Sequence, residues 1–108
     1  MKRGEVWTVA GGASYAAKPR PVVIVQADGF TQTDSITVCP ITSDPAELPL
    51  FRVQLEPSKA NGLRSASSIM ADKVITVRKR NLGRRIGELS ADQMIELGRV
   101  LVVFLGLA

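Results

Sequence analysis

The side chains best suited to chemistry in this sequence are basic, and they are concentrated in its second half. The chain carries a net charge of +4, and residues 61–108 hold eight basic side chains against four acidic ones. Six of the basic side chains fall within thirteen residues: Lys73, Arg78, Lys79, Arg80, Arg84 and Arg85. Such a run favours a polyanionic partner, nucleic acid first, because it can follow a phosphate backbone. A solvated surface without a ligand is the equally ordinary alternative.

Residue types that are missing restrict the chemistry further. The chain contains no His, so it lacks the usual acid-base group near neutral pH and the commonest metal ligand. Its single cysteine, Cys39, cannot form an intrachain disulfide or a Cys-rich zinc site. Cys39 lies in an apolar stretch with no evident base beside it, which predicts an inert buried thiol. A zinc enzyme is therefore excluded.

Length and composition are typical of one folded domain. The chain has 108 residues, of which 45% are hydrophobic and 22% charged, so we expect a single domain over residues 1–108. Residues 1–7 include basic side chains but no apolar stretch follows them, which does not fit a signal peptide. The apolar tail at 100–108 is too short to cross a bilayer. We expect a cytoplasmic protein.

Short strand-like segments fill most of the first eighty residues, namely 6–10, 21–25, 35–41, 50–55, 67–70 and 73–77. The continuous apolar run at 21–25 predicts a central strand covered on both faces. The alternation at 50–55 predicts a strand with one buried face. Pro40 indicates that the strand at 35–41 ends at an edge or a bulge. We expect sequential pairing, as in a meander.

One helix is expected, after a basic connection at 78–85. Ser90 and Gln93 form a capping box, so the helix begins there and runs to about Leu105. Its apolar stripe consists of Met94, Leu97, Leu101 and Leu105, but Val103 lies on the polar face, which favours a partner subunit. Many short strands followed by one helix predict a mainly β protein with a strongly bent antiparallel sheet or barrel.

The order of several motifs resembles that of the MazF/PemK toxins. They are Arg3-Gly4-Glu5-Val6-Trp7, Lys18-Pro19-Arg20-Pro21-Val22-Val23-Ile24-Val25, Pro40-Ile41-Thr42-Ser43, Asn61-Gly62-Leu63 and Ile69-Met70-Ala71-Asp72-Lys73. The resemblance implies a compact SH3-like antiparallel β-barrel with a C-terminal α-helix, as in MazF, PemK and CcdB. It also implies a homodimeric, metal-independent endoribonuclease toxin, held inactive by an antitoxin encoded beside it. It implies no metal and no organic cofactor.

The resemblance further implies which residues act on RNA, whose 2′-hydroxyl is its own nucleophile. Arg20 corresponds to the family's catalytic arginine, which can hold a phosphate bidentately. A surface ion pair with Glu5 is the alternative reading. Thr42 corresponds to the active-site threonine, whose hydroxyl can bind a phosphoryl oxygen. Ser43 can share that work, although both hydroxyls can also cap the turn before Asp44.

Asp72 corresponds to an acidic position that some members use as a base or to organise the arginine. We expect Asp72 to position its neighbours rather than to abstract a proton. Met70 stands where some relatives carry a basic residue, so the general acid and base are not assigned. Cleavage by 2′-hydroxyl attack gives a 2′,3′-cyclic phosphate and a 5′-hydroxyl end, and it would inhibit translation and growth.

The remaining expectations concern partners. The predicted RNA-binding residues are Tyr15, Lys18, Ser43, Lys73, Arg78, Lys79, Arg80, Arg84 and Arg85. Tyr15 and Phe30 offer rings that can stack on unpaired bases, although packing is the more common role for a residue such as Phe30. The cognate antitoxin is expected to contribute an acidic segment that folds on binding. Two other functions stay open: a CcdB-like toxin that binds DNA gyrase, and a non-catalytic RNA-binding barrel.

Overall fold

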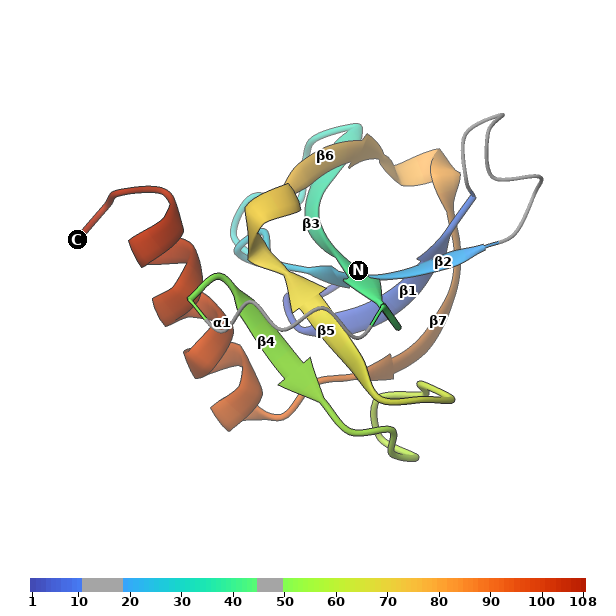
Figure 1. Ribbon diagram of the computed structural model, residues 1–108. Coiled ribbons are helices and arrows are strands. Elements are labelled where there is room, and N and C mark those ends of the chain that lie inside the picture. Colours follow the sequence, from blue (N-terminus) through green and yellow to red (C-terminus); the bar gives the residue numbers. More distant parts are fainter. Residues whose placement is uncertain (11–18, 45–49) are drawn as a thin grey trace.

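The computed structural model describes residues 1–10, 19–44 and 50–108, and Figure 1 shows its elements. The strands are β1 (Glu5–Val9), β2 (Arg20–Ile24), β3 (Ser35–Thr42), β4 (Arg52–Leu55), β5 (Ser67–Met70), β6 (Ile75–Arg78) and β7 (Leu82–Glu88). Two short 3-10 turns, η2 (Ala71–Lys73) and η3 (Lys79–Asn81), flank β6, and the chain ends with helix α1 (Ala91–Phe104). The predicted class, mainly β with a C-terminal helix, is confirmed.

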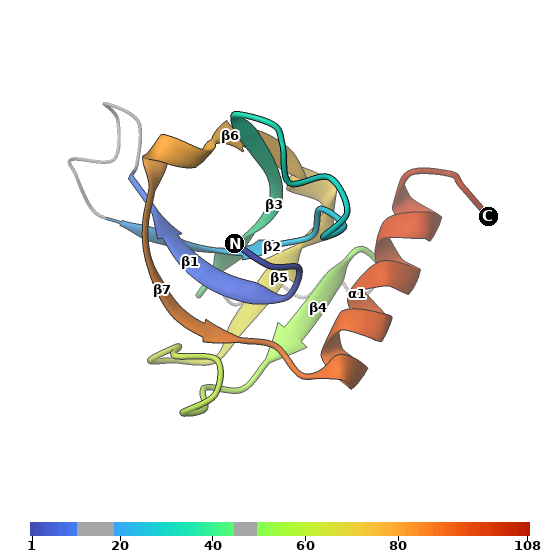
Figure 2. The ribbon, with the colours of Figure 1, turned by 180° about the vertical axis from the view of Figure 1, so that it is seen from behind.

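All strand pairs are antiparallel, and the sheet follows the order β4-β5-β3-β2-β1-β7, with β6 also paired to β3. The sheet curls strongly on itself, as Figures 1 and 2 show from opposite sides. Within the described residues its outer strands β4 and β7 do not pair with each other, so the expected barrel stays open. The expected sequential pairing is confirmed for β1-β2-β3 and for β4-β5. It is wrong for β5 and β6, which both pair with β3, and for β7, which pairs with β1.

Strand β3 is central and not an edge, which corrects the expectation drawn from Pro40. One side of β3 pairs with β2 at residues 38–40. The other side pairs with β6 at residues 35–38 and then with β5 at residues 41 and 42. Pro40 therefore lies where β3 changes partners on that side, and a residue without an N–H group is tolerated there.

Strand β7 was missed in the sequence, where residues 78–85 were expected to be a basic connection. The last residue of β6 and all of η3 occupy the first half of that stretch, and β7 begins at Leu82. Leu82 is buried in the core and lies opposite Val9, so the arginines that follow belong to a strand. The basic side chains obscured the period of two, because Arg84 and Arg85 are both exposed beside a register shift in the β1–β7 pairing.

Two apolar clusters hold the curled sheet together, one on each of its faces. Val23 belongs to the larger cluster, which Leu97 of α1 covers, while Val22 and Ile24 belong to the smaller one with Trp7 against it. The expectation that β2 is buried on both faces is thus confirmed. Helix α1 packs along β4 and η2, on the side of the sheet away from β7 (Figures 1 and 2).

Helix α1 begins as its capping box predicts. The Gln93 N–H donates to Ser90 Oγ at 3.1 Å, and the Ser90 N–H donates to Gln93 Oε1 at 2.8 Å. Leu105 lies just beyond the helix and is 51% exposed, so the expected buried stripe stops at Leu101. In the described part of the chain, no helix is long and apolar enough to cross a membrane.

Candidate active-site pocket

A surface cavity of about 800 Å³ lies where the start of β2, the end of β3, the middle of β7 and the segment before β5 converge. It brings together five residues that the sequence singled out: Arg20, Thr42, Ser43, Arg84 and Arg85. The other lining residues are Thr8, Pro19, Pro21, Ile41, Gly62, Leu63, Arg64, Ser65, Ser67 and Ile86. None of these described lining residues is acidic, so the cavity suits an anion.

The register of the first three strands explains why Arg20 and Thr42 meet. Arg20 opens β2 opposite Val9 of β1, and on its other side β2 pairs with β3 through Val22 and Pro40. When that antiparallel register is continued by two residues, Arg20 lies opposite Thr42. Two positions that are 22 residues apart in sequence thus become neighbours at the wall of one cavity.

The hydroxyl of Thr42 is oriented by the turn that follows β3. Thr42 Oγ1 accepts a hydrogen bond from the Asp44 N–H at 3.1 Å. A threonine hydroxyl that accepts one bond still has its own proton to donate. Turn capping and ligand binding, which we treated as alternatives for Thr42, are therefore compatible in this geometry.

The wall formed by residues 62–67 is held by a buried asparagine. Asn61 is 2% exposed, and its Oδ1 accepts from the N–H groups of Ser58 and Leu63 at 3.0 and 2.9 Å. Gly62 has φ of +71°, and a Cβ there would lie 2.0 Å from the Ile86 carbonyl oxygen. This close approach requires glycine. The Asn61-Gly62-Leu63 motif thus fixes this turn against β7.

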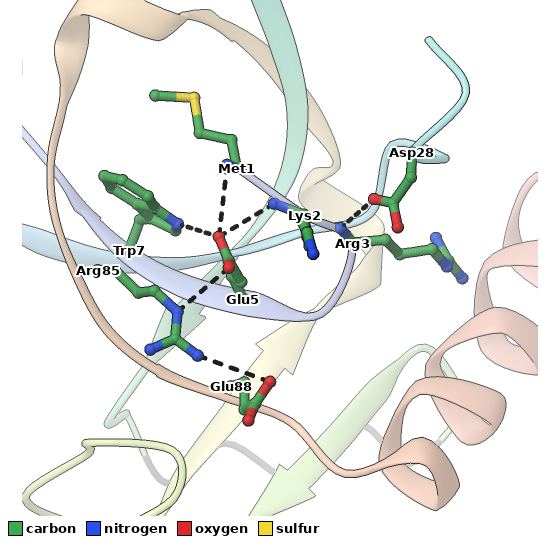
Figure 3. A network of polar contacts seen from close by, with 8 residues as sticks. All are labelled: Met1, Lys2, Arg3, Glu5, Trp7, Asp28, Arg85 and Glu88. Atoms are coloured by element: carbon green, nitrogen blue, oxygen red, sulfur yellow. Dashed lines mark hydrogen bonds and ion pairs between the residues drawn. The ribbon is translucent and has the colours of Figure 1, made fainter. Parts of the chain in front are cut away.

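The arginines of the pocket differ in their electrostatic surroundings. Arg85 Nε lies 3.2 Å from a carboxylate oxygen of Glu5, and Arg85 Nη2 lies 3.6 Å from Glu88 (Figure 3). By contrast, Arg64 and Arg84 form no ion pair with a carboxylate in the described part of the chain. The positive charge of Arg85 is therefore largely compensated, whereas the charges of Arg64 and Arg84 are not.

Glu5 is the centre of the polar network in Figure 3. Burial raises its pKa, but hydrogen bonds from the Lys2 N–H and the Trp7 indole, with the charges of the N-terminal amine and Arg85, outweigh burial. The net effect is a pKa below the ordinary value of 4.5. Glu5, which we considered as a partner for Arg20, thus forms its ion pairs with Arg85 and the N-terminus.

Sequence reasoning missed Arg64, which lines the pocket from the turn after Asn61. Arg64 stands alone, outside the cluster of basic residues at 73–85, so the distribution of charge along the sequence did not single it out. The signal that could have found it is its place directly after the Asn61-Gly62-Leu63 motif, since a residue next to a fixed turn is held in place with it.

Asp72 is not brought to this pocket. Ser67 lines the cavity at the start of β5, whereas Asp72 follows the other end of that strand, in η2. Its carboxylate oxygens lie 3.3 and 3.4 Å from Nε and Nη2 of Arg52. The geometry separates Asp72 from Arg20 and engages it in a contact between η2 and β4.

The predicted basic track is divided. Arg84 and Arg85 line the pocket, but a second cavity of about 540 Å³ is lined by Arg78, Lys79 and Arg80 together with residues 31–34. In it, Lys79 Nζ donates to the Thr31 carbonyl oxygen at 2.7 Å. Lys73, exposed at the end of η2, lines neither cavity. The residues that the sequence placed on one track therefore occupy separate regions.

Two other expectations have structural outcomes. Phe30 is 69% exposed, so the expectation that it packs in the core is wrong. Cys39 is fully buried, and this burial raises the pKa of its thiol to about 12, as expected for an inert cysteine. Tyr15 and Lys18 lie outside the described residues. The described residues contain no group of three or more His, Cys, Asp or Glu side chains that could hold a metal ion.

A curled antiparallel sheet with a terminal helix defines a small, mainly β protein, and its pocket is lined by arginines. Comparison with known families narrows this class. The PemK-like, MazF-like toxins of type II toxin-antitoxin systems match residues 2–105, and the chain belongs to this family.

Individual relatives agree with this assignment. The chain is 45% identical to a probable endoribonuclease MazF of Mycolicibacterium smegmatis over 108 residues, which is 100% of this chain and 99% of the relative. It is 32% identical to the endoribonuclease MazF9 of Mycobacterium tuberculosis, over 99% of this chain and 98% of the relative. Among solved structures, a mycobacterial endoribonuclease in complex with its cognate antitoxin has a TM-score of 0.83 at 25% identity, covering 100% of this chain and 97% of that one.

Proposed function

We propose that this chain is the endoribonuclease toxin of a toxin-antitoxin system, and that it cleaves single-stranded RNA at preferred sequences without a metal ion. The observation that carries the proposal is one cavity in which Arg20 lies opposite Thr42, flanked by further arginines and without a carboxylate among its described lining residues. A phosphodiester is the ligand that such a set of donors suits best. The endoribonuclease relatives named above support the same reading.

In the proposed reaction the 2′-oxygen of a ribose attacks the adjacent phosphorus. The O2′–P bond forms, the P–O5′ bond breaks, the 2′-hydroxyl loses its proton and the departing 5′-oxygen gains one. The products are a 2′,3′-cyclic phosphate and a 5′-hydroxyl end. Negative charge grows on the non-bridging oxygens, where the fork of Arg20 and the hydroxyl proton of Thr42 would stabilise it.

Ser43 and Arg84 are assigned to holding the RNA beside Arg20, since both line the same cavity. Asp72 is assigned a structural role, because Arg52 engages both of its carboxylate oxygens away from the cavity. Arg85 is assigned to supporting the wall through Glu5 and Glu88 as well as adding charge. The proposed chemistry therefore depends on preorganised charge at Arg20 and Thr42.

The experiment incubates the purified protein with a long, largely unstructured RNA in excess EDTA and maps the ends. Arg20→Ala tests the site, Arg20→Lys tests the bidentate fork, and Arg99→Ala on the exposed face of α1 is the matched control. We expect discrete cuts with 5′-hydroxyl ends from the wild type and Arg99→Ala, none from Arg20→Ala and few from Arg20→Lys. Binding without cleavage by the folded wild type would instead support the non-catalytic barrel. Intact, unbound RNA would refute the proposal and turn attention to a protein target such as gyrase.

Partners and consequences follow from this proposal. We infer a homodimer, and an antitoxin with an acidic segment that folds on the toxin. The similar endoribonuclease that was solved in complex with its cognate antitoxin supports an antitoxin partner. The apolar side chains of Phe104, Leu105 and Leu107, which are 45%, 51% and 73% exposed at the end of α1, offer surface for such contacts. We propose that the protein cleaves cellular RNA in the cytoplasm, which would inhibit translation and growth. Light scattering of the purified toxin tests the dimer, and relief of growth arrest by the co-expressed antitoxin tests the partner.

A further inference from the structure

The pocket holds more positive charge than one phosphodiester needs. Four arginines line it, namely Arg20, Arg64, Arg84 and Arg85, and the described lining residues contribute no acidic side chain. A phosphodiester carries a single negative charge, which one bidentate arginine and a hydroxyl already match. Its volume of about 800 Å³ lies in the upper part of the usual range for ligand pockets, roughly 300–1,000 Å³. Charge and size together point to a ligand with more than one phosphate.

We propose that Arg64, together with Arg84 of the same pocket, binds a second backbone phosphate of the RNA, next to the one that is cleaved. This inference rests on the proposed function, and it names a binding subsite within the same pocket. The ligand is a phosphodiester flanking the scissile one, so the subsite recognises the RNA backbone and not a base.

The backbone on both sides of Arg64 is fixed, which a binding residue requires. Before it, the Leu63 N–H donates to the buried Asn61 Oδ1 at 2.9 Å. After it, Ser67 Oγ donates to the Ser65 carbonyl oxygen at 2.9 Å. Because both neighbours are tied to the folded turn, the Arg64 side chain starts from a defined position at the cavity wall. Binding by a residue whose backbone is already ordered loses less entropy.

Electrostatics select Arg64 and Arg84 over Arg85 for this subsite. Arg85 already pairs with Glu5 at 3.2 Å and Glu88 at 3.6 Å. Arg64 and Arg84 make no ion pair with any described carboxylate, so a phosphate there meets charge that is not compensated. The Arg84 N–H also donates to Thr8 Oγ1 at 3.1 Å, which holds this residue of β7 against β1.

The first test measures binding of an uncleavable single-stranded RNA, 2′-O-methylated at the cut site that the cleavage experiment maps. Arg64→Ala is compared with Lys59→Ala, which removes the same charge from an exposed position of the same turn that does not line the cavity. We expect Arg64→Ala to weaken binding about ten-fold and to reduce the slope of log K against log salt by about 0.7, the change for one phosphate contact on a single strand. Lys59→Ala should change both quantities much less. Equal effects of the two variants would overturn the subsite, because they would show a general effect of charge.

The second test identifies the phosphate. A set of the same RNAs, each with one neutral methylphosphonate linkage beside the cut site, is bound to the wild type and to Arg64→Ala. We expect one linkage to weaken wild-type binding and to have no further effect in Arg64→Ala, since the contact is already lost. If every linkage weakens both proteins equally, Arg64 contacts no flanking phosphate and the inference is wrong. A wild type that cleaves RNA but shows no such coupling refutes the subsite alone, whereas a wild type that does not cleave refutes the proposed function.

Discussion

Two clusters of basic side chains on this molecule come from nearly the same stretch of sequence, yet their surroundings differ. Arg84 and Arg85 lie on β7 and line the large pocket together with Arg20 and Arg64, where the other polar side chains carry hydroxyl groups. Arg78, Lys79 and Arg80 lie at the end of β6 and in η3, beside Thr31, Thr33 and the carboxylate-bearing Asp34. In that second cluster the Lys79 ammonium is engaged by the Thr31 carbonyl.

The difference shows that the density of charge in a sequence does not by itself define a site. The pocket gathers side chains from β1, β2, β3, β7 and the segment before β5, so several separate segments fix its shape. The second cluster depends on one continuous segment packed against one loop. Convergence of several segments permits the preorganisation that catalysis needs. We therefore expect substitutions in the pocket to lower the cleavage rate itself, and substitutions in the second cluster to change only the attraction of RNA.

The largest expected effect compares Arg20→Ala with Arg80→Ala. Loss of the Arg20 guanidinium removes charge at the phosphoryl oxygens, and one such donor is worth about 10²–10³ in kcat. Arg80 is exposed in the second cluster, so its removal should change the cleavage rate by less than about three-fold, through weaker attraction of RNA. Initial rates on a defined RNA measure both effects, with saturating substrate giving kcat for Arg20→Ala and low substrate giving kcat/KM for Arg80→Ala. A larger loss in Arg80→Ala than in Arg20→Ala would reverse the comparison and place the site in the second cluster.

The next effect concerns the backbone that shapes each region. Gly62→Ala places a Cβ 2.0 Å from the Ile86 carbonyl oxygen at a φ of +71°, so we expect it to lower the free energy of unfolding by about 3 kcal/mol. Gly29→Ala, near the second cluster, meets no atom within 4 Å and should be nearly neutral. Urea unfolding followed by circular dichroism compares them. If both variants are equally stable, the turn at 58–63 is not the rigid wall that we describe.

Much of the architecture was predictable from periodicity and caps, because those signals are local. The buried run in β2, the alternation in β4 and the capping box of α1 each depend on neighbours within a few residues. Strand β7 was missed because its pairing with β1 joins residues about eighty positions apart, and its two exposed arginines hide the alternation. The partner change at Pro40 likewise depends on strands distant in sequence.

The site was predictable in part for a similar reason. Arg20 and Thr42 were found through motifs, and the register of β2 and β3 then explains why they meet. Asp72 belongs to the same motif series, but it follows the far end of β5 and pairs with Arg52 there. Membership of the motif series therefore did not predict whether Asp72 lines the pocket. Arg64 carried no pattern of its own, and only the folded turn shows that it lines the pocket.

A smaller effect tests the hydroxyl of Thr42. Thr42→Val keeps the shape but removes the donor, so we expect the cleavage rate to fall about 10- to 100-fold, the value of a hydrogen bond to a charged group. Thr42→Ser restores the hydroxyl and should recover most of the rate. Thr31→Val makes the same change beside the second cluster and should have little effect. A Thr42→Ser variant as slow as Thr42→Val would show that the rate does not depend on the hydroxyl, and the proposed role of Thr42 would be wrong.

The smallest expected effect concerns Glu5, whose carboxylate pairs with Arg85 and so compensates the charge of that pocket arginine. Because its folded pKa is lowered below 4.5, ionised Glu5 contributes stability at pH values above its unfolded pKa, and this contribution is lost as the pH falls through the folded pKa. Glu5→Gln keeps the size and accepting oxygen of the side chain but not its charge. We expect it to lower the free energy of unfolding by about 1 kcal/mol at pH 7. Urea unfolding of both proteins from pH 7 to about pH 3 should show this difference shrinking toward zero below pH 4.5. If the difference in unfolding free energy between the two proteins stays constant with pH, Glu5 does not stabilise the fold through its charge. Arg85 would then be available to RNA like Arg64 and Arg84.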